Sequence, residues 1–340
     1  MAKVTSASLK TVAFGGLIRE DVMNQIWDIS NIPLPFADAV GSGSHANAYC
    51  EWTQNTLAAP NLSNAVIDGA DVTSNNEALP VRVGNQSQIS AKRVQVSTRS
   101  QNSDVIGQNN ALAWQIMERQ KELRRDVDAI AVSQQASVAD NGSSTAGQSA
   151  GLGAWLVTNV SRAAGGANGG FANGIVATPT TGTTPRALSE ATVRDIAQSI
   201  YQNGGNCTLA MSMPAVIRKF SEYLFSSTAK VATMFTDLAQ SREAAVAKGA
   251  ANVFVTDFGV VLELVANRLQ ALVTTSNANF YLIDPQYLEL SYMQGYTTEA
   301  LAKTGTSDTR MMTVDWSLKV LSEKAQGVVA DVNGALSAVA

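Results

Sequence analysis

The sequence predicts an α+β protein organised around one long helix. Residues 108–135 contain neither proline nor glycine, and their apolar residues recur at three-, four- and seven-residue steps, which places one apolar stripe along a helix. Residues 79–100 alternate polar and valine-rich positions, as a two-stranded ribbon does. Residues 186–296 combine helical and strand patterns, as a compact α/β domain does.

The composition favours a protein whose surface is covered by partners. Charged residues make up 15% of the 340 residues, whereas soluble proteins usually carry ~25%. The net charge of −4 argues against non-specific binding to a phosphate backbone. No apolar run reaches the ~18 residues of a membrane span, and the N-terminus lacks a signal-peptide core. Cys50 and Cys207 lie outside any CxxC pair, so we expect two buried thiols.

The first hundred residues predict extended structure. Residues 1–54 predict an arm with a short helix at 19–29, and a strand is expected at 49–57. An irregular loop follows over 58–79, and Gly84-Asn85 marks a turn or bulge in the ribbon of 79–100. Because this ribbon has little apolar surface of its own, we expect residues 58–100 to contact other subunits more than their own chain.

The long helix is expected to have a buried and a charged side. Leu123 lies on the apolar stripe, and ion pairs are expected between Glu118 and Lys121 and between Arg124 and Asp128. Beyond it, a glycine- and serine-rich loop spans 141–185, and Ser189 is expected to cap the next helix. The patterns then predict helices at 188–201 and 214–225, and strands at 207–213, 253–265, 280–283 and 311–332.

The sequence predicts no catalytic, cofactor-binding or metal-binding residue. His45 is the only histidine, and we expect it to be exposed or at an interface. Gly151 and Gly153 lack the third glycine of a dinucleotide fingerprint. Asp68 and Asp71 lack a third carboxylate, so a solvated loop is favoured over a weak cation contact. The basic residues are instead expected to contact other subunits; the candidates are Arg82, Lys92, Arg93, Arg99 and Arg125.

An ordered set of short motifs resembles the major capsid proteins of short-tailed bacteriophages, which have the Hong Kong 97-like fold. The motifs run along nearly the whole chain: Ile32-Pro33-Leu34-Pro35-Phe36, Tyr49 to Trp52, Gly69-Ala70-Asp71, Arg82 with Asn85, Gln88 and Ile89, Lys121 to Asp126, Gly204-Gly205, Asp257-Phe258-Gly259 and Asn267-Arg268. The chain differs at Gln86, where an aromatic residue is more usual after the asparagine.

The resemblance implies a division of the chain. It implies an N-terminal arm at 1–54, an extended β-hairpin loop at 55–106 and an axial domain at 186–296. A peripheral domain is implied at 107–185 and 297–340, with the helix of 108–135 as its spine.

The resemblance also implies a mechanical function. Pentamers and hexamers of the chain would form an icosahedral head that encloses double-stranded DNA without reading its sequence and without a membrane. Assembly would take place in the host bacterial cytoplasm with a separate scaffolding protein, a portal and, as an option, a decoration protein. We expect the intact chain in the virion. The alternatives are the shell of an encapsulin-type nanocompartment and, against the absence of motifs, an enzyme with an unrecognised site.

Overall fold

The computed structural model describes residues 33–69, 71, 79–108, 110–226, 253–270, 272, 277–303 and 305–333. The helix expected over 19–29 lies outside these residues. Internal contacts divide the chain into two units. One comprises Met1–Asn31, Arg93–Lys121 and Thr298–Met311, and the other comprises Ile32–Lys92, Glu122–Thr297 and Met312–Ala340.

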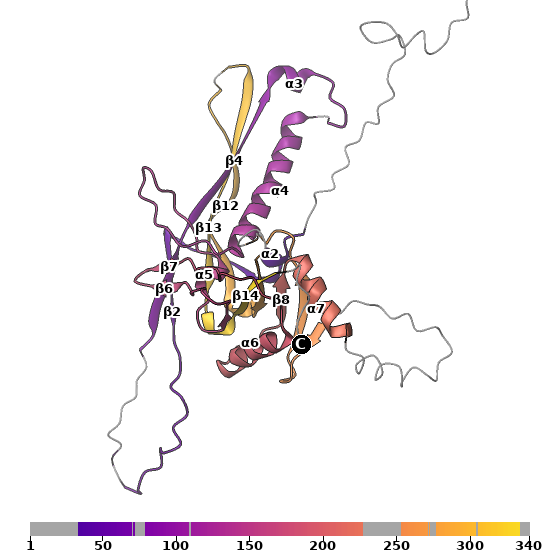
Figure 1. The fold of residues 1–340 in the computed structure, drawn as a ribbon. Coiled ribbons are helices and arrows are strands. Elements are labelled where there is room, and N and C mark those ends of the chain that lie inside the picture. Colours follow the sequence, from indigo (N-terminus) through magenta and orange to yellow (C-terminus); the bar gives the residue numbers. More distant parts are fainter. Residues whose placement is uncertain are drawn as a thin grey trace, which may run out of the picture. The chain divides into compact units, whose positions relative to one another are not determined.

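The long helix of the prediction is α4, Ala111–Ala131 (Figure 1). The side-chain oxygen of Asn110 accepts a hydrogen bond from the N–H of Ala113 at 3.1 Å, as a residue at a helix start does. On the apolar stripe, Leu123 and Val127 are each only 1% exposed. The predicted stripe is therefore confirmed in this half of the helix.

A four-stranded sheet has the strand order β1-β12-β13-β4. The strands are β1 (Gly41–Ser44), β12 (Leu288–Ala300), β13 (Ser307–Val320) and β4 (Gln88–Ser97). The single strand expected over 311–332 is wrong, because the chain leaves β13 through a short 3-10 turn, Glu323–Ala325, and forms β14, Gly327–Val332, in another sheet.

The second sheet has six strands in the order β5-β14-β11-β8-β10-β9. They are β5 (Val160–Ser161), β14, β11 (Ala278–Ile283), β8 (Leu209–Ser212), β10 (Val261–Ala266) and β9 (Val253–Val255). Two helices, α6 (Glu190–Gln202) and α7 (Pro214–Ser226), supply side chains to its core. The helices and strands expected between 186 and 296 are thus present, but β5 and β14 come from outside that range.

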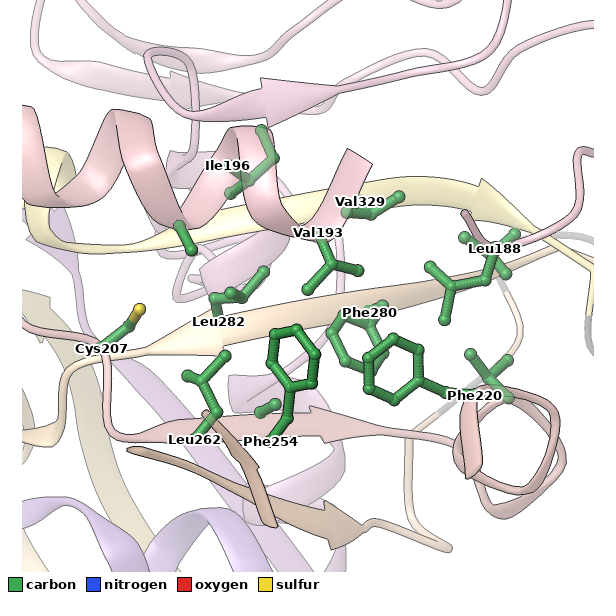
Figure 2. Packing of buried hydrophobic residues seen from close by; sticks show 14 of the residues in the cluster. Leu188, Val193, Ile196, Cys207, Phe220, Phe254, Leu262, Phe280, Leu282 and Val329 are labelled. Atoms are coloured by element: carbon green, nitrogen blue, oxygen red, sulfur yellow. The ribbon is translucent and has the colours of Figure 1, made fainter. Parts of the chain in front are cut away.

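Figure 2 shows how this core is filled. Val193 of α6 points toward Phe280 of the sheet, and Phe220 of α7 meets Phe280 from the side. The rings of Phe220 and Phe280 have centroids 5.6 Å apart. Ser189 precedes α6 but makes no side-chain cap hydrogen bond, so its expected capping role is wrong.

The ribbon differs from the prediction in its partner strands. β3 (Val81–Gln86) pairs antiparallel with β2 (Tyr49–Gln54), from Tyr49 opposite Gln86 to Gln54 opposite Val81. The expected turn or bulge at Gly84-Asn85 is wrong, because both residues lie inside β3 and its register with β2 is unbroken. A Cβ on Gly84 would come within 2.6 Å of the Tyr49 ring, so the glycine permits close packing rather than a turn.

Asn85 is enclosed and forms hydrogen bonds across the fold. Its Nδ2 donates to the carbonyl of Leu318 at 2.8 Å, and its Oδ1 accepts from the N–H of Ala150 at 2.9 Å. Val83, Val94 and Val96 are also buried within the chain. Residues 81–97 therefore have buried contacts within their own chain, and the expectation that residues 58–100 mainly contact other subunits stays a prediction.

The segment 141–185 has little secondary structure; its residues 149–156 are buried, whereas 141–146 are exposed. It contains α5 (Leu152–Trp155) and a small ribbon of β6 (Gly170–Ala172) and β7 (Ile175–Ala177). Asn173 and Gly174 form the turn between β6 and β7 with φ of 53° and 83°, as a type I′ turn requires. The remaining short helices are α2 (Pro35–Ala39), α3 (Thr98–Asn102) and the 3-10 turn Pro285–Tyr287.

Candidate functional site

The most unusual surface of the chain is the segment between β2 and β3. We call residues 55–80 the ribbon loop. Within its described part, large apolar side chains stand in solvent: Leu57 is 88% exposed, Leu62 97%, Ile67 83% and Leu79 81%. Neither helix nor strand occurs in its described residues. Exposed apolar side chains gathered in one segment mark an interaction surface.

The root of the ribbon is held firmly, in contrast to its loop. The indole N–H of Trp52 and the side-chain amide of Gln54 both donate to the carbonyl of Val320, at 3.0 and 3.1 Å. The Trp52 ring lies 5.4 Å from that of Trp155, which is buried. The hydroxyl of Tyr49 donates to the carbonyl of Gly174 at 3.1 Å. These contacts fix the direction in which the ribbon leaves the body of its unit.

Two of the predicted contact residues already have acidic partners in the same chain. Arg82 lies on β3, is largely exposed and pairs with Glu51 across the ribbon. Lys92 on β4 lies 2.7 Å from Asp126 and 3.3 Å from Glu122 on α4. Burial opposes its charge, but these two carboxylates together raise the pKa of Lys92 above its ordinary value. Lys92 therefore links β4 to α4 within one copy.

The other three contact candidates lie on three different elements. Arg93 is exposed on β4, where its guanidinium donates to Gln95 at 3.3 Å, and Arg99 is exposed on α3. Arg125 is half-buried on α4, and its Nε is enclosed without a hydrogen-bond partner among the described residues.

Nearly every residue of the charged motif on α4, Lys121 to Asp126, has a structural role. Lys121 pairs with Glu118 at 3.1 Å, as expected. The expected pair of Arg124 and Asp128 is wrong: Arg124 stacks over the ring of Tyr296, 5.3 Å from its centroid. Tyr296 lies on β12, a strand that the sequence did not predict.

Asp128 faces inward rather than toward solvent. Its carboxylate accepts from the N–H of Ala37 at 2.8 Å and from the Asn267 amide at 3.3 Å. Burial raises the pKa of Asp128, whereas these hydrogen bonds oppose that rise. The carboxylate thus joins α2 to the segment after β10, and the Asn267-Arg268 motif has its reason in this contact.

A cavity of 490 Å³ at the end of α4 is lined by neutral side chains, including Gln134, Gln270, Asn279 and Tyr281. Burial raises the pKa of Tyr281 to about 12, which keeps its hydroxyl protonated. Gly153 lies nearby, where a Cβ would come within 2.5 Å of that hydroxyl, so this GxG serves close packing.

The two thiols and the histidine are likewise enclosed, fully or in part, by the fold. Cys50 and Cys207 are free and buried, as expected, and burial raises the pKa of Cys207 to about 11, far from a reactive thiolate. His45, expected to be exposed or at an interface, is half-buried with both ring nitrogens hydrogen-bonded.

Two further classes of site are absent from the described part of the chain. Its histidine, cysteine and acidic side chains form no group of three that could hold a metal ion. Its helices include none that is both long and apolar enough to cross a membrane.

Comparison with known proteins gives a consistent result. The family model described as SU10 major capsid protein matches residues 3–333. The major capsid protein of Escherichia phage Phieco32 is 26% identical over 226 residues, which cover 58% of this chain and 64% of that protein. The chain therefore spans less than two thirds of this curated relative's length.

Solved structures share the fold at low sequence identity. The capsid of Myoviridae phage XM1 matches with a TM-score of 0.54 and 12% identity, over 93% of this chain and 99% of its own. An encapsulin complex from Synechococcus elongatus PCC 7942 matches with a TM-score of 0.55 and 10% identity, over 100% and 99%. The resemblance expected from the motifs is confirmed: the chain has the Hong Kong 97-like fold and belongs to the SU10 major capsid protein family.

Proposed function

We propose that copies of this chain assemble, as pentamers and hexamers, into the icosahedral head shell that encloses the double-stranded DNA of a tailed bacteriophage. The function is mechanical, without a catalytic step or a cofactor. The chain resides in the virion after assembly in the host bacterial cytoplasm. A separate scaffolding protein and a portal are the proposed assembly partners, and a decoration protein is a further candidate.

The main observation in support of this proposal is the exposed ribbon loop. Moving a leucine- or isoleucine-sized side chain out of water is worth about 1.5–3 kcal/mol. Leu57, Leu62, Ile67 and Leu79 do not gain that energy within their own chain, because each is more than 80% exposed. A second copy that covers the loop supplies it, and repetition of the same contact around a closed ring gives every copy a covered loop.

The division into shell domains is part of the proposal. We assign 1–54 to the arm, α4 to the spine, 186–296 to the axial domain, and 107–185 with 297–340 to the peripheral domain. The extended loop implied at 55–106 is narrowed to 55–80, because β4 belongs to the four-stranded sheet. Residues 327–332 are better placed with the axial domain, because β14 pairs with β11.

Charged residues contribute specificity to the proposed contacts rather than most of their energy. Arg82, Arg93, Arg99 and Arg125 remain candidates for contacts between copies. Lys92 is the least suited of the five, because it is engaged by Glu122 and Asp126 of its own chain. Exposed ion pairs are typically worth less than ~1 kcal/mol each.

An encapsulin-type nanocompartment is the second candidate, because an encapsulin shares the fold. The match to a capsid-protein family over nearly the whole chain favours the phage head. The contents of the particle decide between them. Electron microscopy and nuclease treatment of particles from infected cells should show shells that protect DNA. Shells that hold protein cargo and no DNA would support the nanocompartment instead.

The role of the ribbon loop is tested with two variants at one position. Leu62→Asp places a charge on the most exposed leucine, whereas Leu62→Met keeps an apolar side chain of similar volume. We expect both full-length proteins to fold, and only the aspartate variant to fail to form shells in sedimentation and negative-stain images. Shell formation by Leu62→Asp at the wild-type level would refute the proposed role of the loop.

A further inference from the structure

The only histidine of the chain lies near the Tyr49–Gln86 end of the β2–β3 ribbon, the end opposite the ribbon loop. His45 belongs to the turn that leads from β1 into β2, and Ser87 follows β3 directly. The backbone N–H of Ser87 donates to the carbonyl of Ala48 at 2.7 Å, and the N–H of His45 donates to the carbonyl of Tyr292 at 3.3 Å. The turn is therefore attached both to the end of β3 and to β12.

A chain of side-chain hydrogen bonds passes through the imidazole. Ser87 Oγ bonds to a carboxylate oxygen of Asp315 on β13. His45 Nε2 lies 3.2 Å from Ser87 Oγ, and His45 Nδ1 lies 2.9 Å from Ser291 Oγ on β12. The chain Asp315–Ser87–His45–Ser291 thus joins β12 and β13 to the turn and to the residue between β3 and β4. We call it the histidine junction.

The donors in this junction fix one neutral tautomer. The carboxylate of Asp315 can only accept, so the single hydroxyl proton of Ser87 points toward it. Ser87 Oγ then accepts from His45, which places the imidazole proton on Nε2. Nδ1 carries no proton and accepts from the hydroxyl of Ser291. Each donor has an acceptor when His45 is neutral.

Protonation breaks this arrangement at Nδ1. An imidazolium donates from both nitrogens, so Ser291 has to turn its hydroxyl proton away from the ring. Ser291 is fully buried, which excludes water as the new acceptor, and its side-chain neighbour is the thiol of Cys50, a weak acceptor. A buried donor is left poorly satisfied.

The charges around the ring act in both directions. Burial is the main influence and lowers the pKa of His45 below 6.5; Asp315 and Glu289 oppose this, and Lys319 adds to it. Lys319 in turn lies 2.9 Å from Glu289, which draws part of that carboxylate's charge away from the ring. Lys319 and three residues of β2 also line a small cavity beside the imidazole: Tyr49, Cys50 and Glu51.

We propose that protonation of His45 opens the histidine junction, so that the root of the β2–β3 ribbon loosens in acid. Neutral His45 stabilises the fold above the ordinary histidine pKa, and this contribution is lost as the pH falls through the folded-state pKa. The inference concerns a single chain and does not rest on the proposed assembly. It makes the end of the ribbon opposite the ribbon loop sensitive to pH.

Hydrogen exchange of the full-length, unassembled chain tests the proposal. Exchange is followed at about pH 7.5 and about pH 5.5, on either side of the ordinary histidine pKa, and corrected for intrinsic rates. Peptides covering 41–54 and 81–92 should exchange faster at the lower pH, by up to about tenfold for each unit by which folding lowers the pKa. Peptides covering 209–220, in the six-stranded sheet, serve as the internal control and should not change.

His45→Gln is the matched variant, because a glutamine donates and accepts but does not titrate in this range. We expect it to remove the acid-dependent acceleration in 41–54 and 81–92. An acceleration of the same size in the variant, or none in the wild-type chain, would overturn the proposal. Should the variant not fold, the imidazole resonance of the wild-type chain decides: a midpoint at or above 6.5 contradicts the junction described here.

Discussion

In the six-stranded sheet, Phe280 and Leu282 are fully enclosed by helices and strands of the same chain. In the ribbon loop, Leu62 and Ile67 stand in solvent at 97% and 83% exposure. Both regions use apolar side chains, yet only the first gains their burial energy when one chain folds. The difference separates residues that stabilise the fold from residues whose energy becomes available when copies associate.

Removing one aromatic ring from the enclosed region is the strongest test of the difference between the two regions. Phe280→Ala should lower the free energy of unfolding by about 3–5 kcal/mol, because it leaves a cavity beside Phe220. Leu62→Ala should change it by less than ~0.5 kcal/mol, since the side chain touches little of its own chain. Urea unfolding of the two full-length variants, monitored by circular dichroism, measures both values. Equal losses in the two would remove the distinction between the regions.

The long helix permits a second test, within a single element. Leu123 is 1% exposed and Met117 is 54% exposed on the same helix. Leu123→Ala should cost about 2–5 kcal/mol and lower the melting temperature, because α4 loses a packed side chain. Met117→Ala, the matched control, should have a small effect. An unchanged melting temperature for Leu123→Ala would mean that α4 is not a packed spine.

The sequence predicted those elements whose signal is local. Such local signals are the apolar stripe of α4, the proline that begins α7 and the apolar run of β8, each of which lies within a few helical turns or one strand. The structure has these elements at or near the expected residues. Pairing over long distances was not predicted. β3 pairs with β2 across the whole ribbon loop, whereas the sequence had favoured its nearer neighbour β4.

The surroundings of several other residues were predicted wrongly for a related reason. Gly84-Asn85 has the composition of a turn, but the tight contact with Tyr49 and the buried amide of Asn85 explain both residues. Asp128 lies among charged neighbours in sequence and yet faces the interior, because Ala37 and Asn267 supply its donors from distant segments. A signal for β12 was present in the alternation of Leu288, Leu290 and Tyr292 with polar residues. The exposed leucines of the ribbon loop became a candidate surface only when the structure showed that nothing in the described chain covers them.

The smallest expected effect on stability is that of a substitution at Arg125. This substitution tests whether the residue serves the fold or a contact between copies. Arg124 and Arg125 are adjacent on α4, but Arg124 stacks on Tyr296, whereas the enclosed Nε of Arg125 has no hydrogen-bond partner among the described residues. Arg124→Ala should cost about 0.5–1 kcal/mol through the lost cation–π contact. Arg125→Ala should cost less, because no ion pair or hydrogen bond among the described residues is lost with it. If Arg125 instead serves as an anchor between copies, as arginines often do at interfaces, its variant should fold normally and assemble poorly. Circular dichroism reports the first property and sedimentation velocity the second. Normal shells from Arg125→Ala, with Arg124→Ala as the control for a change in helix charge, would place Arg125 with the residues that serve only the fold.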